Sequence, residues 1–371
     1  MPTQPHQPSE HTPTQPTQPR LSLLDRFLPM WILAAMALGL ALSQFTPGLG
    51  RALESMQLGG ISLPIALSLL VMMYPPLAKV RYDKAGGVAA NKKLMTLSLA
   101  LNWIVGPALM FALAWAFLPD QPELRTGLII VGLARCIAMV LVWSDLSCAD
   151  REVTAVLVAI NAIFQVLMFA ALGWFYLQIL PGWLGLPTTS AEFSFWAIFL
   201  SVVVFLGVPL AAGAGSRIVG EKARGRQWYE DRFLPKISPL ALVGLLYTIV
   251  LLFALQGDEV IAAPGSVARV AVPMTLYFFI MFAIALLASR GAGLGYARSA
   301  SVAFTAAGNN FELAIAVAIG TFGADSGQAL AGTIGPLVEV PVLVALVYAL
   351  QVVGPKLFPQ DATLPQAASS R

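Results

Sequence analysis

Long apolar runs are the feature that most constrains this chain. Runs of at least 17 residues recur from Leu28 to Gly354, and a helix of that length spans most of the roughly 30 Å of hydrocarbon in a bilayer. Charged residues make up only 11% of the sequence, against about 25% in soluble domains. Because so few ionic groups cannot cover a water-exposed surface, the sequence predicts an all-α integral membrane protein.

Ten transmembrane spans are expected from the apolar lengths and the helix breakers that flank them. An even number of spans places both chain termini on the same side of the membrane. The expected spans are residues 28–45, 61–80, 94–118, 124–143, 153–179, 193–215, 239–255, 267–289, 299–322 and 328–353.

The basic residues are distributed unequally between the two sets of loops. If both termini lie in the cytoplasm, the cytoplasmic segments contain 18 of the 22 Lys and Arg residues, and the external loops contain 3. Such a bias marks the cytoplasmic side of a membrane protein. We therefore expect a multi-pass protein of the plasma membrane with both termini in the cytoplasm.

Four segments are expected along the chain. Residues 1–20 are polar and rich in proline, without the apolar stretch of a secretory signal, which predicts a disordered cytoplasmic tail. Residues 21–180 and 181–355 hold five spans each. Because five is an odd number, two such repeats enter the membrane from opposite faces, as inverted repeats do in many transporters. Residues 356–371 are expected to form a cytoplasmic C-terminal tail.

Small or polar residues interrupt the fourth span of each five-helix repeat. The first interruption is GLARC, residues 132–136, and the second is AAGNNFE, residues 306–312. Discontinuous helices at corresponding positions of two repeats are typical of a transporter binding site. The sequence therefore predicts that the fourth and ninth helices are discontinuous and cross at the midplane.

Three ionisable residues, Arg135, Glu312 and Glu339, lie deep within spans. On insertion scales each costs about 2.5 to 3.5 kcal/mol alone in hydrocarbon, so each requires a partner or a hydrated cavity. We expect Arg135 to form an ion pair with Glu312, and Glu339 is the competing partner. A purely structural ion network is the alternative interpretation.

Cys136 follows Arg135 directly, and Gly132 lies one helical turn before it. A single cysteine in a span is commonly a small packing residue. An adjacent guanidinium favours the thiolate, which is the reactive form and a soft metal ligand, and a glycine leaves space beside the sulfur. Cys136 is therefore a candidate binding residue, whereas Cys148 is expected to be a loop thiol without a role.

Side-chain amides accompany these residues. Asn309 and Asn310 lie at the second interruption, and Asn161 and Gln165 share one face of the fifth span. Singly, such amides commonly bridge neighbouring helices. Together with Asn102 of the third span they predict a hydrated cavity, in which Asn309 and Asn310 contact the ligand.

Several function classes find no support in the sequence. It has no GxxxxGK[ST] phosphate-binding loop and no HExxH or GxSxG motif, and both histidines, His6 and His11, lie in the N-terminal tail. The basic residues follow the loops rather than forming a separate patch, which argues against nucleic-acid binding. We expect no cofactor and no enzymatic activity, and the oligomeric state stays open.

A set of stretches between Leu24 and Val347 carries a family resemblance. They read LDRFLPMWILAAMALG, MMYPPLAKVRY, LNWIVGPALMFALAW, GLARCIAMVLVW, FTAAGNNFELAIAVAIG and GPLVEVPVLVALV. Together they resemble the arsenite efflux permeases of the arsenical resistance-3 family, in the bile acid:sodium symporter superfamily. The resemblance implies ten spans, a core domain with crossed fourth and ninth helices, and a panel domain that moves against it. It also implies that Cys136 is required for metalloid transport and that Glu312 serves proton coupling.

The expected function is export of arsenite from the cytoplasm in exchange for protons, with antimonite as a possible second substrate. In this hypothesis Cys136 contacts the arsenic, Asn309 and Asn310 hold its hydroxyls, and a proton on Glu312 weakens its hold on Arg135. Two rivals stay open. One is a sodium-coupled symporter for organic anions, and the other is a receptor or scaffold that binds a ligand without transporting it.

Overall fold

The computed structural model describes residues 27–46, 48–49, 52, 55–58, 61–81, 88, 90–188, 194–323 and 326–361. The regular secondary structure of this part of the chain is helical, apart from one antiparallel hairpin of β1 (Gln57–Leu58) and β2 (Ile61–Ser62). The expected N-terminal tail lies outside the described residues, as do the last ten residues of the chain.

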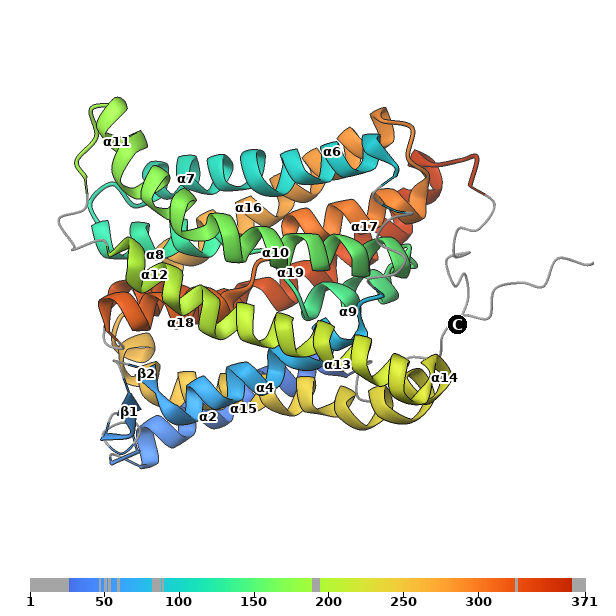
Figure 1. Cartoon of the computed structure of the whole chain (residues 1–371). Helices are drawn as coiled ribbons and strands as arrows, with labels where there is room; N and C mark the ends of the chain where they lie inside the picture. The colour runs from blue at the N-terminus through green and yellow to red at the C-terminus, as the bar shows by residue number, and fades with distance from the viewer. Residues whose placement is uncertain are drawn as a thin grey trace, which may run out of the picture.

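The helices form two layers that lie side by side (Figure 1). The smaller layer contains α2 (Leu28–Phe45), α4 (Leu63–Lys79), α13 (Val208–Arg224) and α15 (Leu234–Ala262). Within it, α15 packs against α2 and α4, and α13 packs against α4. The short helix α14 (Arg226–Trp228) leads from α13 towards α15.

The larger layer contains most of the other helices, both long and short. Among them α16 packs against α7, α17 and α19, and α8 packs against α7 and α19. The members are α6 (Lys92–Ala100), α7 (Gly106–Phe117), α8 (Pro122–Leu133), α9 (Met139–Leu146), α10 (Arg151–Trp174), α11 (Leu180–Trp183), α16 (Pro264–Gly291), α17 (Tyr296–Ala307), α18 (Phe311–Phe322) and α19 (Gly327–Leu357).

One helical segment joins the layers. Its first half, α12 (Phe195–Val202), packs against α10 and α18 of the larger layer, and its second half is α13 of the smaller layer. The two halves are separated by a π-helical turn.

Four π-helical turns interrupt long helices, and each ends two residues before a proline. In each turn the residue before the proline donates its N–H to the carbonyl five residues earlier. A proline lacks the N–H and its ring clashes with the carbonyl four residues back, and the wider turn relieves this clash. The turns are η1 (Leu101–Val105), η2 (Phe175–Ile179), η3 (Val203–Gly207) and η4 (Tyr229–Phe233), before Pro107, Pro181, Pro209 and Pro235.

Each of the ten expected spans coincides with a helix, or with consecutive helices, of the structure. The first expected span, residues 28–45, has the bounds of α2. Six helical segments of the described residues are long and apolar enough to cross a membrane, and three shorter apolar helices accompany them. The expected interruptions are confirmed, because residues 134–138 separate α8 from α9 and residues 308–310 separate α17 from α18.

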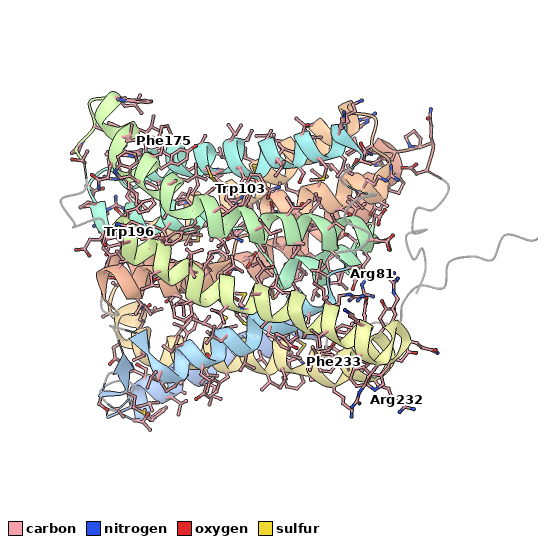
Figure 2. The ribbon with its side chains drawn as sticks, in the orientation of Figure 1. Arg81, Trp103, Phe175, Trp196, Arg232 and Phe233 are labelled. Carbon is pink, nitrogen blue, oxygen red and sulfur yellow. The ribbon has the colours of Figure 1, made fainter. Side chains whose placement is uncertain are left out.

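The two ends of the helices differ in chemistry. Arg81 and Arg232 lie at the end that carries α14, and Trp196 lies towards the opposite end (Figure 2). We call the end that carries α14 the basic end. There Glu230 forms ion pairs with Arg81, Arg217 and Arg226. Arg81 also reaches Glu152 of α10, so this cluster ties the smaller layer to the larger one.

Candidate functional site

The two helix breaks lie against each other as a short antiparallel pair. Arg135 and Asn309 face each other across a β-bridge. Asn310 N donates to Ala134 O over 3.1 Å, and Cys136 N donates to Gly308 O over 3.3 Å. Each break thus supplies partners for backbone groups that the other break frees, as a helix interrupted within a membrane requires.

Gln165 of α10 completes this arrangement. Its Oε1 accepts from Arg135 N at 2.8 Å, and its Nε2 donates to Arg135 O at 3.0 Å. The amide therefore pairs with both backbone groups of Arg135, much as a neighbouring strand would. The sequence placed Gln165 near the site, and the structure gives it a role in holding the first break.

The guanidinium of Arg135 is completely buried and binds neutral oxygens. Its Nη1 donates to the Tyr277 hydroxyl at 2.8 Å and to Ala306 O at 3.2 Å, and its Nη2 donates to Gly132 O. The two carbonyls lie in the last turns of α17 and α8. Because helix C-termini carry partial negative charge, one cation serves both broken helices.

The expected ion pair of Arg135 is therefore wrong for this conformation. Neither Glu312 nor Glu339 forms a salt bridge to it within the described part of the chain. Gly106 explains how the guanidinium reaches its position, because a Cβ there would lie 2.8 Å from Arg135 Nη1 and 3.1 Å from the Tyr277 hydroxyl.

Cys136 turns away from Arg135. The backbone N–H groups of Met139 and Val140, in the first turn of α9, lie close to the sulfur. Successive side chains of an extended segment point in opposite directions, so sequence neighbours in this break do not share one surface. The expected support of the sulfur by Arg135 is wrong, and the N-terminus of α9 is the electropositive group beside it.

Gly132 does not leave space beside the sulfur. A Cβ at Gly132 would lie 2.4 Å from Cγ of Met110, so the glycine allows α7 and α8 to pack closely. Its expected role beside a ligand stays a prediction. Gly132 contributes to the site through its carbonyl, which binds Arg135.

The two asparagines of the second break have different tasks. Asn310 caps α18, because its Oδ1 accepts from Leu313 N at 3.0 Å, and its Nδ2 lies 4.0 Å from the Met73 sulfur. Asn309 is 1% exposed, and neither Oδ1 nor Nδ2 has a hydrogen-bond partner among the described residues. A buried amide left unpaired costs about 1 to 3 kcal/mol, so this side chain is available to bind a ligand.

Two carboxylates lie near the crossing. Glu339 is buried in α19 between Pro336 and Pro341, and its Oε1 accepts from Asn309 N at 3.4 Å. Glu312 is half-buried in the first turn of α18. Both carboxylates lie within electrostatic range of the Cys136 sulfur.

Asn102 and Asn161 belong to a separate polar contact. Asn161 Nδ2 donates to Asn102 Oδ1 at 3.3 Å and its Oδ1 accepts from Trp103 Nε1 at 3.1 Å, while Asn102 Nδ2 donates to Ser98 O at 2.8 Å. These amides join η1 to α10. They do not line the cavity described next, and their expected support of a hydrated cavity stays a prediction.

A cavity of about 140 Å³ lies between α4, α9 and α15, at the boundary of the two layers. Its walls are mainly apolar. Lys79, Asp145 and Arg151 lie on its basic-end side, and Ala138 and Met139 form part of its wall. The Met139 N–H lies close to the Cys136 sulfur, so the cavity reaches the turn of α9 beside the thiol.

Tyr277 and Gly106 were not found by sequence reasoning. Tyr277 lies in the apolar stretch LYFFI, and Gly106 precedes Pro107 within a span. The phenolic hydroxyl in an apolar run was the available signal, because a buried Tyr usually finds a hydrogen-bond partner.

Comparison with known proteins identifies the family. Residues 66–263 match the Sodium Bile acid symporter family. The chain is 70% identical to the arsenical-resistance protein Acr3 of Corynebacterium glutamicum over 351 residues, which are 95% of both chains. The chain belongs to the Acr3 arsenical-resistance transporters.

Two further relatives are more distant. An arsenical-resistance protein Acr3 of Alkaliphilus metalliredigens is 32% identical over 337 residues, covering 88% of this chain and 92% of the relative. An uncharacterized transporter of Synechocystis is 35% identical over 346 residues, covering 88% of each chain. Membership of the Acr3 transporters agrees with the family that the six sequence stretches resembled.

Proposed function

We propose that the protein exports arsenite from the cytoplasm in exchange for protons. The observation that carries this proposal is the crossing of the two breaks, where the Cys136 sulfur lies at the N-terminus of α9 and the buried Asn309 amide has no hydrogen-bond partner in the described part of the chain. The Acr3 relatives, named for arsenical resistance, support the choice of substrate.

Arsenite is a neutral trihydroxide at neutral pH, and soft As(III) prefers sulfur to oxygen ligands. The Cys136 sulfur displaces one hydroxyl, and the thiol proton leaves with it as water. Asn309 offers one donor and one acceptor to the remaining hydroxyls. Because a single thiol, that of Cys136, binds the arsenic, the arsenic is held weakly enough to be released. Antimonite, with the same charge and softness, is a second substrate.

Glu312 and Glu339 are the groups that carry protons. Arg135 keeps its neutral partners throughout, so the coupling depends on the two carboxylates near the sulfur rather than on opening an arginine ion pair. One proton that moves inward contributes about 2.3 kcal/mol per 100 mV of membrane potential. This energy drives export of a neutral substrate, on which the potential itself does not act.

The basic end of the helices faces the cytoplasm in this proposal. Its exposed arginines follow the expected bias of basic residues to that side (Figure 2). Both termini then lie in the cytoplasm, ten spans form two inverted repeats, and the protein resides in the plasma membrane. The cavity between α4, α9 and α15 gives arsenite access to Cys136 from the cytoplasm.

Arsenite flux in proteoliposomes under an imposed pH gradient tests the proposal. We expect gradient-driven flux in the wild type and in Cys148→Ser, and a loss to background in Cys136→Ser. Cys148 is the matched control, because it is the other cysteine of the chain. Equal flux in Cys136→Ser and the wild type would show that Cys136 is a packing residue.

A sodium-coupled symporter for organic anions is the second candidate, favoured by the match to the Sodium Bile acid symporter family. In that case oxygens of Asn309, Asn310, Glu312 and Gln165 would surround Na⁺. Uptake would depend on a sodium gradient and would be unaffected by Cys136→Ser. The same proteoliposomes, with a sodium gradient in place of the pH gradient, separate the two candidates.

A further inference from the structure

The crossing of the breaks lies between an open side and a closed side. On the basic-end side, the cavity separates α9 of the larger layer from α4 and α15 of the smaller layer. Along α15, the lining residues end at Leu245, and Gln256 follows after 11 residues, roughly 16 Å further along the helix.

Gln256 meets the larger layer at this point. The Thr333 hydroxyl of α19 donates to Gln256 Oε1, and the two residues are 0% and 3% exposed. Thr333 precedes Glu339 by six residues, which is roughly 9 Å along α19 towards the end opposite the cavity. A buried polar contact therefore joins the two layers just beyond the site.

A hydrogen bond between the two layers is suited to a contact that opens and closes during transport. An apolar contact would favour the closed state in proportion to its area, whereas a single hydrogen bond adds little net free energy because water replaces it when the layers separate. The ion-paired cluster of Arg81 at the basic end ties the same two layers at the other side of the site.

We propose that Gln256 and Thr333 form the external gate of the transport path. With the pair joined, the site is accessible through the cavity. When the pair separates, α19 and α15 part and the site becomes accessible from the opposite face. The gate rests on the proposed function in one respect only, which is that this opposite face is the external one.

Accessibility of Cys136 to a membrane-impermeant methanethiosulfonate, added outside intact cells, tests the gate. In a Cys148→Ser background, Cys136 is the single thiol of the chain. Removal of one net hydrogen bond by Thr333→Val should raise the external labelling rate about fivefold. Gln256→Leu should also raise this rate, and the double variant should add little to the faster of the two single variants, because both changes remove the same hydrogen bond.

Ser43→Ala is the matched control. Ser43 donates to Asp258 at 2.7 Å, two residues from Gln256, but both partners belong to the smaller layer. Its labelling rate should equal that of the background protein. An unchanged rate in Thr333→Val, or an equal increase in Ser43→Ala, would overturn the gate. Because the readout is thiol labelling, a failure of arsenite transport would not affect it.

A crosslink provides a second measurement that does not depend on a weakened contact. With Cys148→Ser, the pair Gln256→Cys and Thr333→Cys should form a disulfide on oxidation that reduces external labelling of Cys136 to background. Reductant should restore labelling to the unoxidised rate. Labelling that persists in fully crosslinked protein would show that the external path lies elsewhere.

Discussion

The two helix breaks use their side chains in opposite ways. In the first break, Arg135 is bound on its guanidinium by Tyr277 and two carbonyls, and on its backbone by Gln165. In the second break, Asn310 caps a helix and the Asn309 amide has no hydrogen-bond partner among the residues that the structure describes. The charged residue holds the crossing together, and the neutral amide is the group left for a ligand.

This difference separates stability from transport. Substitutions that remove the support of the first break should destabilise the protein before any effect on binding is visible. A substitution of the unpartnered amide should change transport without lowering stability. Thermal unfolding in detergent and arsenite flux, measured on the same variants, therefore test the comparison from both sides.

The largest effect is expected for Arg135→Met, which has similar length and no hydrogen-bond donor. It leaves Gly132 O, Ala306 O and the Tyr277 hydroxyl without their shared donor, and the loss in unfolding free energy should be about 3 kcal/mol or more. Arg135→Lys should recover only part of it, because an ammonium lacks the planar fork of a guanidinium. A wild-type unfolding temperature for Arg135→Met would contradict the holding role of this residue.

Gln165→Leu should have the next largest effect. It removes two hydrogen bonds to the Arg135 backbone, and the expected loss is about 2 kcal/mol in unfolding free energy. Gln351→Leu is the control, because Gln351 makes a single hydrogen bond of 3.0 Å to Leu146 O in a half-buried place. Equal unfolding temperatures for the two variants would show that the breaks do not depend on Gln165.

Much of this fold could be predicted from the sequence, because a bilayer allows few backbone structures to cross it. The apolar run at residues 28–45 predicted α2, and the polar interruptions predicted both breaks. The partner of Arg135 could not be predicted, because Tyr277 is 142 residues away and only the tertiary packing brings it near. The surroundings of Cys136 and Gly132 were misjudged because the break is extended rather than helical.

Asn309→Leu should affect transport rather than stability. The amide has no partner among the described residues, and a buried amide left unpaired costs about 1 to 3 kcal/mol, so its removal should not lower the unfolding free energy. Arsenite flux at low substrate concentration should fall about tenfold, as loss of about 1.4 kcal/mol of binding implies. Asn310→Ala is the contrasting variant, because loss of the cap should cost about 1 kcal/mol of stability. A lower unfolding temperature and normal arsenite flux in Asn309→Leu would show that this amide supports the fold and does not bind the substrate.

The smallest effect belongs to an arginine outside both breaks. Arg269 donates to Asp120 at 2.9 Å in the loop before α8, and this hydrogen bond lowers the pKa of Asp120 from 3.8 to about 2. A lowered pKa in the folded state gives stability that is present above pH 3.8 and is lost as the pH falls to about 2. Because the pair is exposed, Arg269→Gln should barely change the unfolding temperature at pH 7, and its small difference from the wild type should vanish towards pH 2. A large decrease in the unfolding temperature at pH 7 would show that this exposed pair stabilises the protein as much as the buried contacts of the two breaks.

In the proposed mechanism, one thiol of the first break binds the arsenic and one amide of the second break binds its hydroxyls. Arsenic K-edge absorption of the arsenite complex, prepared in the Cys148→Ser protein, tests it most directly. We expect a first shell with one sulfur and otherwise oxygen or nitrogen, and a shell without sulfur when Cys136 is also replaced by Ser. A shell of oxygen alone in the protein that retains Cys136 would contradict it.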